Sequence, residues 1–99
     1  MDFWLTILHN NDGESQVIDA GGGLGHPVSH RAMNKAIQKA QELGVGFVTV
    51  RNSNHYGIAG YYATMALDHD CIGISMTNSS PLVVPTFGRA AKLGTNPIA

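Results

Sequence analysis

Apolar residues recur at helical spacing in one long segment near the middle of the chain. Within residues 28–43 they fall three and four positions apart, while Lys35 and Lys39 lie on the opposite side. This period gives a helix one apolar stripe and one charged face. Pro27 suits the first turn of a helix and Gly44 suits its end. The pattern therefore predicts a helix over residues 28–43.

Three further elements are predicted after this helix. Residues 45–50 form an apolar run on both faces, which is typical of a strand buried on both sides and predicts one over residues 46–51. Apolar and aromatic side chains at helical spacing predict a second helix over residues 57–69. Residues 71–77 then predict a second buried strand. The order of helix and strand would suit a doubly wound parallel sheet, but no second helix pair completes one.

The N-terminal part has the pattern of a hairpin. Residues 3–8 and 15–20 are rich in strand formers, and the turn-forming residues 10–13 separate them. The chain ends in residues 97–99, where another apolar strand begins. We therefore expect an interior fragment of a longer protein, with residues 1–99 forming a single partial domain.

The composition indicates that other protein covers part of the surface of this chain. Only 13% of the 99 residues are charged and 43% are apolar. This charge content is about half that of an average soluble domain. A free-standing domain needs more charge on its surface. The low value predicts that the chain packs within a larger polypeptide or an oligomer.

Charge and cysteine content exclude several classes of protein. A net charge of -1 argues against nucleic acid and acidic membranes as partners. No apolar run is long enough for a membrane span, and the N-terminus has no signal-peptide pattern. The single cysteine, Cys71, excludes an internal disulfide framework and suits a reducing compartment. We expect a cytoplasmic protein.

Polar residues follow both predicted buried strands. His55 ends the polar turn 52–55, residues 78–80 close the second strand, and Asn96 adds an amide further on. Ligands are commonly bound at such strand ends. A free imidazole titrates near pH ~6.5. Together these groups suit a polar organic ligand with one proton to move.

Each of these features also has a plain structural interpretation. Residues 52–54 are the usual types at a helix N-terminus, and His55 is then only a polar turn residue. Likewise Ser79 and Ser80, before a proline, are typical of an ordinary turn. Spacing alone leaves both interpretations open.

Other chemistries fit the sequence poorly. The glycine-rich residues 21–25 lack the G-x-G-x-x-G spacing of a dinucleotide loop. His26 and His30 are four apart, but no third ligand follows at a useful spacing, so no metal site is expected. Cys71 opens a predicted buried strand, where it is expected to act as a small apolar side chain rather than a nucleophile.

Three ordered motifs carry a family resemblance. They are residues 50–62 (VRNSNHYGIAGYY), 72–81 (IGISMTNSSP) and 94–99 (GTNPIA). In sequence and separation they resemble the type-2 malate/L-lactate dehydrogenase family, which includes ureidoglycolate and sulfolactate dehydrogenases and reductases of keto and imino acids. The resemblance runs from about Val17 onward, and three motifs at these separations are highly specific.

The resemblance implies a fold and a reaction. The implied fold class is α+β, a non-Rossmann fold with a mostly antiparallel sheet and flanking helices that works as a homodimer. The implied activity is reversible hydride transfer between NAD or NADP and a small 2-hydroxy or 2-keto (or imino) acid. His55 matches the family's proton-transferring histidine. Ser79 matches a serine that contacts the cofactor, and Asn96 is a candidate substrate contact.

The chain also departs from the family. Members are several-fold longer and carry an N-terminal Ser-His-Gly motif with an arginine that holds the substrate carboxylate. Here Ser29 and His30 are followed by Arg31 instead of glycine and lie downstream of the glycine-rich stretch. Most of the family's cofactor-binding residues correspond to positions after Ala99. We expect the isolated chain to be inactive; the alternative is a truncated, non-catalytic remnant that acts only by associating with other chains.

Overall fold

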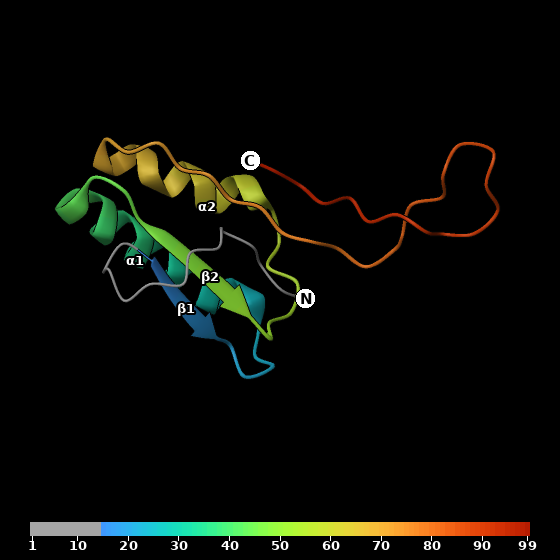
Figure 1. Cartoon of the computed structure of the whole chain (residues 1–99), viewed down its shortest axis with the longest axis horizontal. Coiled ribbons are helices and arrows are strands. Elements are labelled where there is room, and N and C mark those ends of the chain that lie inside the picture. The colour runs from blue at the N-terminus through green and yellow to red at the C-terminus, as the bar shows by residue number, and fades with distance from the viewer. Residues whose placement is uncertain (1–14) are drawn as a thin grey trace.

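The computed structural model describes residues 15–99, which form a body and a projecting arm (Figure 1). The molecule measures 49 × 27 × 23 Å along its principal axes. The body contains, in order, β1 (Ser15–Asp19), α1 (Gly25–Leu43), β2 (Phe47–Arg51), α2 (Ala59–Met65) and the short 3-10 helix η1 (Ala66–His69). The first strand of the predicted hairpin, residues 3–8, lies outside the described residues.

The two strands of the body pair in parallel. Ser15 lies opposite Phe47 at one end, and Asp19 lies opposite Arg51 at the other. Helix α1 is the connection between them, as parallel neighbours require, because a tight turn can join only antiparallel strands. Within the described residues, the expected mostly antiparallel sheet is therefore not found. The sheet that the described residues form has two strands, β1 and β2, and they are parallel.

Helix α1 begins earlier than its apolar period predicts. It starts at Gly25, after Leu24, a residue whose side chain caps no backbone N–H. Since no Ser, Thr, Asp or Asn marks this start, the sequence signal for it is weak. The end agrees with prediction. Gly44 has a φ of 91°, and its N–H donates to the Ala40 carbonyl at 2.8 Å.

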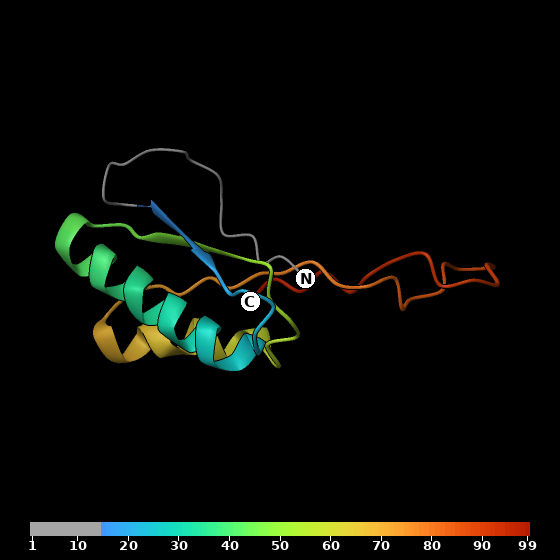
Figure 2. The same cartoon turned by 90° about the horizontal axis from the view of Figure 1, so that it is seen from below.

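The helices lie on one side of the strand pair (Figure 2). Helix α1 covers one face of the strands, and α2 packs beside α1. The core between them consists of branched aliphatic, alanine and tyrosine side chains: Ile18, Val28, Ala32, Ala36, Val48, Val50, Tyr56, Ala59 and Tyr62. In β2, Val48 and Val50 are buried against this core, while Phe47 and Thr49 on the other face are half-buried, so full burial on both faces is not found within the described residues.

The prediction of a buried strand over residues 71–77 is also wrong. In the described structure this segment makes only an isolated bridge, from Met76 to Ile98. Ile72 is 93% exposed, and the backbone at Gly73 lies against α2, where an added Cβ would be 2.0 Å from the Ala63 carbonyl oxygen. The segment therefore runs across α2 instead of pairing with β2.

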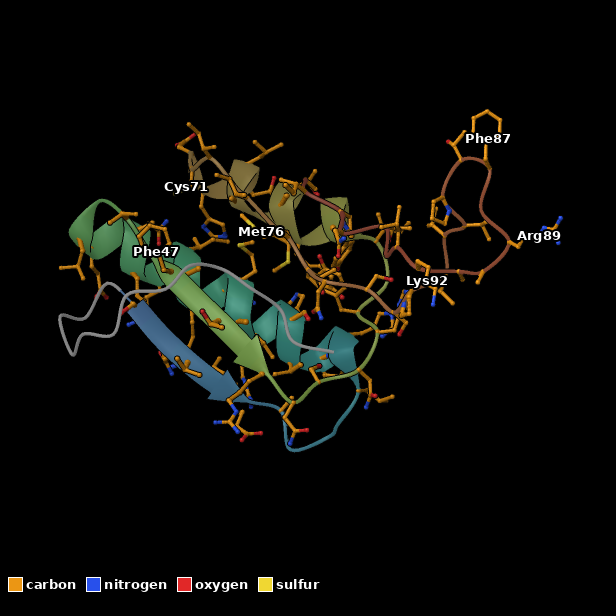
Figure 3. All side chains as sticks on the ribbon, turned by 45° about the vertical axis from the view of Figure 1, so that its right-hand side comes forward. Phe47, Cys71, Met76, Phe87, Arg89 and Lys92 are labelled. Carbon is orange, nitrogen blue, oxygen red and sulfur yellow. The ribbon has the colours of Figure 1, made fainter. Side chains whose placement is uncertain are left out.

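The arm, residues 75–99, leaves the body as a long antiparallel loop. Ser75 and Ala99 exchange two backbone hydrogen bonds of 2.8 Å at its base, and Val83 pairs with Leu93 further out. Phe87 projects from the far end and is fully exposed (Figure 3). Among the described residues, no helix has the length and apolar character needed to cross a membrane.

Candidate functional site

His55 lies on an exposed loop at the carboxyl end of β2. We call residues 52–58 the His55 loop. The His55 side chain is exposed, and its Nδ1 accepts a hydrogen bond from the Gly57 N–H at 3.0 Å. Gly57 has a φ of 85°, a conformation that favours glycine. This positive φ and the hydrogen bond together hold the ring at the rim of the loop.

The glycine-rich turn between β1 and α1 supports this loop from below. The Asn54 side-chain amide donates to the carbonyl oxygens of Gly22 and Gly23 at 2.8 and 3.0 Å. Gly25 lies directly against the loop, since an added Cβ would be 2.3 Å from the Asn54 oxygen and 2.4 Å from the His55 oxygen. The backbone that carries His55 is thus packed tightly on the start of α1.

A small polar cluster ties the ends of the two strands together. The Asp19 carboxylate accepts the Gly21 N–H at 2.8 Å and the Asn52 side-chain amide at 3.4 Å, and lies 3.6 Å from Arg51. The Gly21 hydrogen bond is the main cause that holds the pKa of Asp19 below its usual value, against a smaller desolvation effect that raises it. Asn52 and Arg51 add to the lowering. The cluster fixes the start of the His55 loop.

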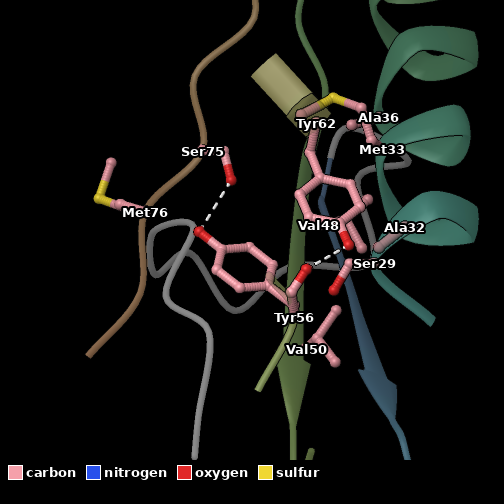
Figure 4. Close-up of a pocket in the computed structure, with 10 residues that line it drawn as sticks. All are labelled: Ser29, Ala32, Met33, Ala36, Val48, Val50, Tyr56, Tyr62, Ser75 and Met76. Atoms are coloured by element: carbon pink, nitrogen blue, oxygen red, sulfur yellow. Dashed lines mark hydrogen bonds between the residues drawn. The ribbon is translucent and has the colours of Figure 1, made fainter. Parts of the chain in front are cut away.

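Tyr56 connects the loop to the core and the arm (Figure 4). Its ring is buried and stacks on Tyr62 with centroids 4.9 Å apart, and the Tyr62 hydroxyl donates to the Tyr56 carbonyl. The Tyr56 hydroxyl lies 3.2 Å from Ser75 Oγ at the base of the arm. Burial raises the pKa of Tyr56, partly offset by the bond to Ser75, and burial likewise raises the pKa of Tyr62.

A small apolar cavity lies beside these tyrosines. It has a volume of about 40 Å³ and is bounded by α1, β2, the tyrosine pair and residues 75–76 (Figure 4). Ser29 Oγ is buried at its wall and has no hydrogen-bond partner among the described residues. A second hollow of about 500 Å³ lies between the end of α1, the start of β2 and residues 70–74.

Ser79 and Asn96 lie together on the two strands of the arm. The backbone at Gly94 touches Ser79, because an added Cβ would be 2.7 Å from the Ser79 oxygen. The Ser79 hydroxyl bonds only to the neighbouring Ser80 carbonyl, at 3.3 Å, among the described residues. Asn96 has a φ of 44°, and its side-chain amide lies 3.4 Å from the Gly94 oxygen.

His55 is not in direct contact with this pair. Within the described residues, no hydrogen bond joins His55 to Ser79 or Asn96, and the Tyr56–Ser75 hydrogen bond links the His55 loop to the base of the arm. The loop after β2 and the base of the arm nevertheless lie at the same end of the body (Figures 1 and 2). The connection between the His55 loop and the segment that carries Ser79 therefore runs through the base of the arm.

The donor set fits one end of a nicotinamide but does not enclose the group. A carboxamide needs one donor and one acceptor, and the half-buried Ser79 hydroxyl can serve as either. Neither of the two hollows is lined by His55, Ser79 or Asn96. Residues 15–99 also contain no group of three or more His, Cys, Asp or Glu that could hold a metal ion.

Several residues that shape the site have no distinctive sequence signal. Asn54 and Tyr56 lie within the quoted motif 50–62, but they act, as Gly25 does, through contacts with other segments of the chain that the motif does not reveal. Gly57 lies within the quoted motif, but its role as a donor to His55 depends on a positive φ that the sequence shows only as a glycine. The one available hint is that a polar turn follows β2 while a glycine-rich turn follows β1.

Comparison with known proteins identifies the family. Residues 6–99 match the family described as malate/L-lactate dehydrogenase. The chain is 61% identical over 83 residues to a malate dehydrogenase of Pyrococcus horikoshii, which covers 84% of this chain and 23% of that protein. It is 53% identical over 83 residues to an L-sulfolactate dehydrogenase of Methanocaldococcus jannaschii, covering 84% and 24%. The chain therefore belongs to the malate/L-lactate dehydrogenase family.

Solved structures agree with this assignment. The Pyrococcus horikoshii malate dehydrogenase aligns with a TM-score of 0.81 and 56% identity, covering 90% of this chain and 26% of that one. A malate dehydrogenase of Entamoeba histolytica aligns with a TM-score of 0.80 and 45% identity, covering 90% and 25%. The chain spans about a quarter of the length of these relatives.

Proposed function

We propose that this chain is the part of a dehydrogenase that carries its proton-transferring histidine. The complete enzyme would move a hydride between NAD or NADP and a small 2-hydroxy, 2-keto or imino acid, as a cytoplasmic homodimer. Residues 1–99 form one partial domain of it. The proposal is supported mainly by the position of His55, an exposed imidazole at the end of β2 on a backbone that contacts of Asn54 and Gly25 hold in place.

The chemistry requires a base at this position. When the carbon of a 2-hydroxy acid loses its hydride and becomes a carbonyl carbon, its hydroxyl proton must leave at the same time. The lone pair of the neutral His55 ring accepts that proton, and in reduction the protonated ring returns it. The bound nicotinamide supplies the hydride acceptor or donor. Ser79 would bond the carboxamide end of that group, and Asn96 would bond the substrate.

A chimera tests this proposal. The matched residues of this chain would replace the corresponding segment of the Pyrococcus horikoshii malate dehydrogenase, with malate oxidation as the assay. We expect His55→Ala to lower turnover by on the order of 10²–10⁴-fold while cofactor affinity changes little. Ser79→Ala should weaken cofactor binding by about 1 kcal/mol, the contribution of one neutral hydrogen bond.

His30 provides the matched control, since it is an exposed histidine on α1. His30→Ala should leave both turnover and cofactor affinity unchanged. Oxidation should fall on the acid side as the His55 imidazole is protonated, and this inflection should vanish in His55→Ala. Near-normal turnover with an unchanged pH profile in His55→Ala would leave His55 as a turn residue only.

A second function is supported by the exposed apolar side chains of the arm. Leu82 is 75% exposed, Ile98 is 75% exposed and Phe87 is fully exposed. Such a surface favours a piece that acts by association with other chains. Sedimentation of the isolated chain at several concentrations tests this function. A monomer at all concentrations would exclude self-association, whereas the chimera decides the catalytic proposal independently.

A further inference from the structure

The hydrogen bond between Gly57 and His55 fixes which ring nitrogen carries the proton. A backbone N–H can only donate, so His55 Nδ1 must accept through its lone pair. A neutral imidazole has one N–H, which must then be on Nε2. Nε2 has no hydrogen-bond partner among the described residues, and the side chain is exposed. In the neutral ring, the N–H of Nε2 thus faces solvent as a hydrogen-bond donor.

We propose that the Gly57 N–H occupies the position that the substrate hydroxyl takes at His55 Nδ1 during oxidation, so that Gly57 is a positioning residue for the proton transfer. This inference rests on the proposed function of His55. The only lone pair of the neutral ring is on Nδ1, because Nε2 already carries a hydrogen. As the substrate O–H bond breaks, its proton would form an N–H bond at Nδ1, and a bound nicotinamide would supply the acceptor for the hydride.

When no substrate is bound, protonation of the ring at Nδ1 and release of the Gly57 N–H are then a single event. Once Nδ1 carries a proton, two N–H groups would face each other, and the 3.0 Å contact cannot persist. The Asn54 and Gly25 contacts hold the backbone on the His55 side of the loop. The side that yields is therefore the ring torsion or the peptide unit of Gly57, which precedes α2 and lacks a Cβ.

Other titratable groups are packed against this loop. His26, in the first turn of α1, has its Nε2 beside Gly57, 2.9 Å from where a Cβ would be. Asp19 and Arg51 form their ion pair at the start of the loop. Tyr56 is buried below it. Of these, His26 is the group that must be distinguished from His55 in any titration of Gly57.

Nuclear magnetic resonance of the 99-residue chain tests the inference without any activity assay. The ring nitrogens of His55 should show a protonated Nε2 and an unprotonated Nδ1 on the alkaline side of the titration. The Gly57 amide proton should lie downfield there, and it should move upfield on acidification with the same midpoint as the His55 ring. A ring without the Gly57 hydrogen bond would sample both tautomers. A shared midpoint for the Gly57 amide and the His55 ring is the decisive measurement, because it shows that the hydrogen bond is lost when the ring is protonated.

Two exposed substitutions complete the design. His55→Gln should abolish the titration of the Gly57 amide, while His26→Gln should preserve it at an unchanged midpoint. A protonated Nδ1 at alkaline pH would overturn the inference, as would a Gly57 titration that disappears in His26→Gln and survives in His55→Gln. If instead the coupling is found but His55→Ala retains turnover in the chimera, the proposed function fails and the Gly57 coupling stands.

Discussion

Tyr56 and Ser75 join the His55 loop to the base of the arm through one buried hydrogen bond, 3.2 Å between their hydroxyl oxygens. Both residues are at least nine-tenths buried. Because Tyr56 directly follows His55 and Ser75 lies four positions before Ser79, this bond connects the loop that carries His55 with the segment that carries Ser79. Its loss should affect both the stability of the body and the placement of the arm.

Tyr56→Phe tests this connection. The substitution keeps the stacked ring and removes only the hydroxyl, so the free energy of unfolding should fall by about 1 kcal/mol. Ser75→Ala should cost a similar amount, and the double variant should cost less than the sum of the two. Urea unfolding provides the measurement, with Tyr61→Phe as the control because Tyr61 is 58% exposed. Additive effects of the two substitutions would mean that the bond contributes nothing.

Ser29→Ala should leave stability unchanged or raise it. Ser29 Oγ is buried at the wall of the small cavity and has no partner within the described part of the chain. A buried polar group without a partner costs about 1–3 kcal/mol. Its removal should therefore increase the unfolding free energy by up to about that amount. A clear loss of stability would show that the hydroxyl is bonded, most simply to a water in the cavity.

Ser53→Ala is the matched control for Ser29. Ser53 is equally buried, but its hydroxyl donates to the Asn54 carbonyl at 3.4 Å. We expect this variant to lose stability by about 1 kcal/mol. The two serines would thus respond with opposite signs in the same urea experiment, although both are buried and both lose the same atom.

The sequence predicts where the helices and strands of this fold lie better than it predicts which of them pair or pack together. The apolar period places α1, and Gly44 marks its end correctly, because both signals are local. The pairing of β1 with β2 depends on α1 as a crossover, which local strand patterns do not contain. Residues 71–77 have the composition of a buried strand, yet contact between Gly73 and α2 takes them away from β2.

The candidate site likewise has features that the sequence predicts and features that it does not. His55 is predictable as the last polar residue of a turn after a strand, and the family motif singles it out. Its tautomer is not predictable, since that depends on the positive φ of Gly57. The support from Asn54 is also absent from any local pattern, because its acceptors, Gly22 and Gly23, lie about thirty positions away.

Asp19 should make the stability of the chain depend on acid pH. Its folded-state pKa is lowered, mainly by the Gly21 N–H. The sign follows directly: the carboxylate contributes stability above its unfolded-state pKa, about 3.9, and this is lost as pH falls through the lower folded value. The urea midpoint should therefore decline in this range, and less so in Asp19→Asn. The exposed Asp68 offers the control, since Asp68→Asn should leave the decline intact.

Gly25 and Gly60 should respond to alanine with opposite signs. At Gly25 an added Cβ would be 2.3 Å from the Asn54 oxygen, and backbone atoms cannot give way as a flexible side chain can. Gly25→Ala should destabilise the chain by on the order of 1–3 kcal/mol. At Gly60, within α2, the nearest atom would be 3.9 Å away, so Gly60→Ala should stabilise it by about 0.5–1 kcal/mol.

The Gly25 variant should also displace the His55 loop, because the clash involves the carbonyl oxygens of both Asn54 and His55. In the nuclear magnetic resonance spectrum of the chain, Gly25→Ala should shift the Gly57 amide toward the position it has when His55 is protonated. Gly60→Ala should leave that signal in place. If Gly25→Ala loses stability while the Gly57 signal stays unchanged, the start of α1 supports the fold but does not position His55.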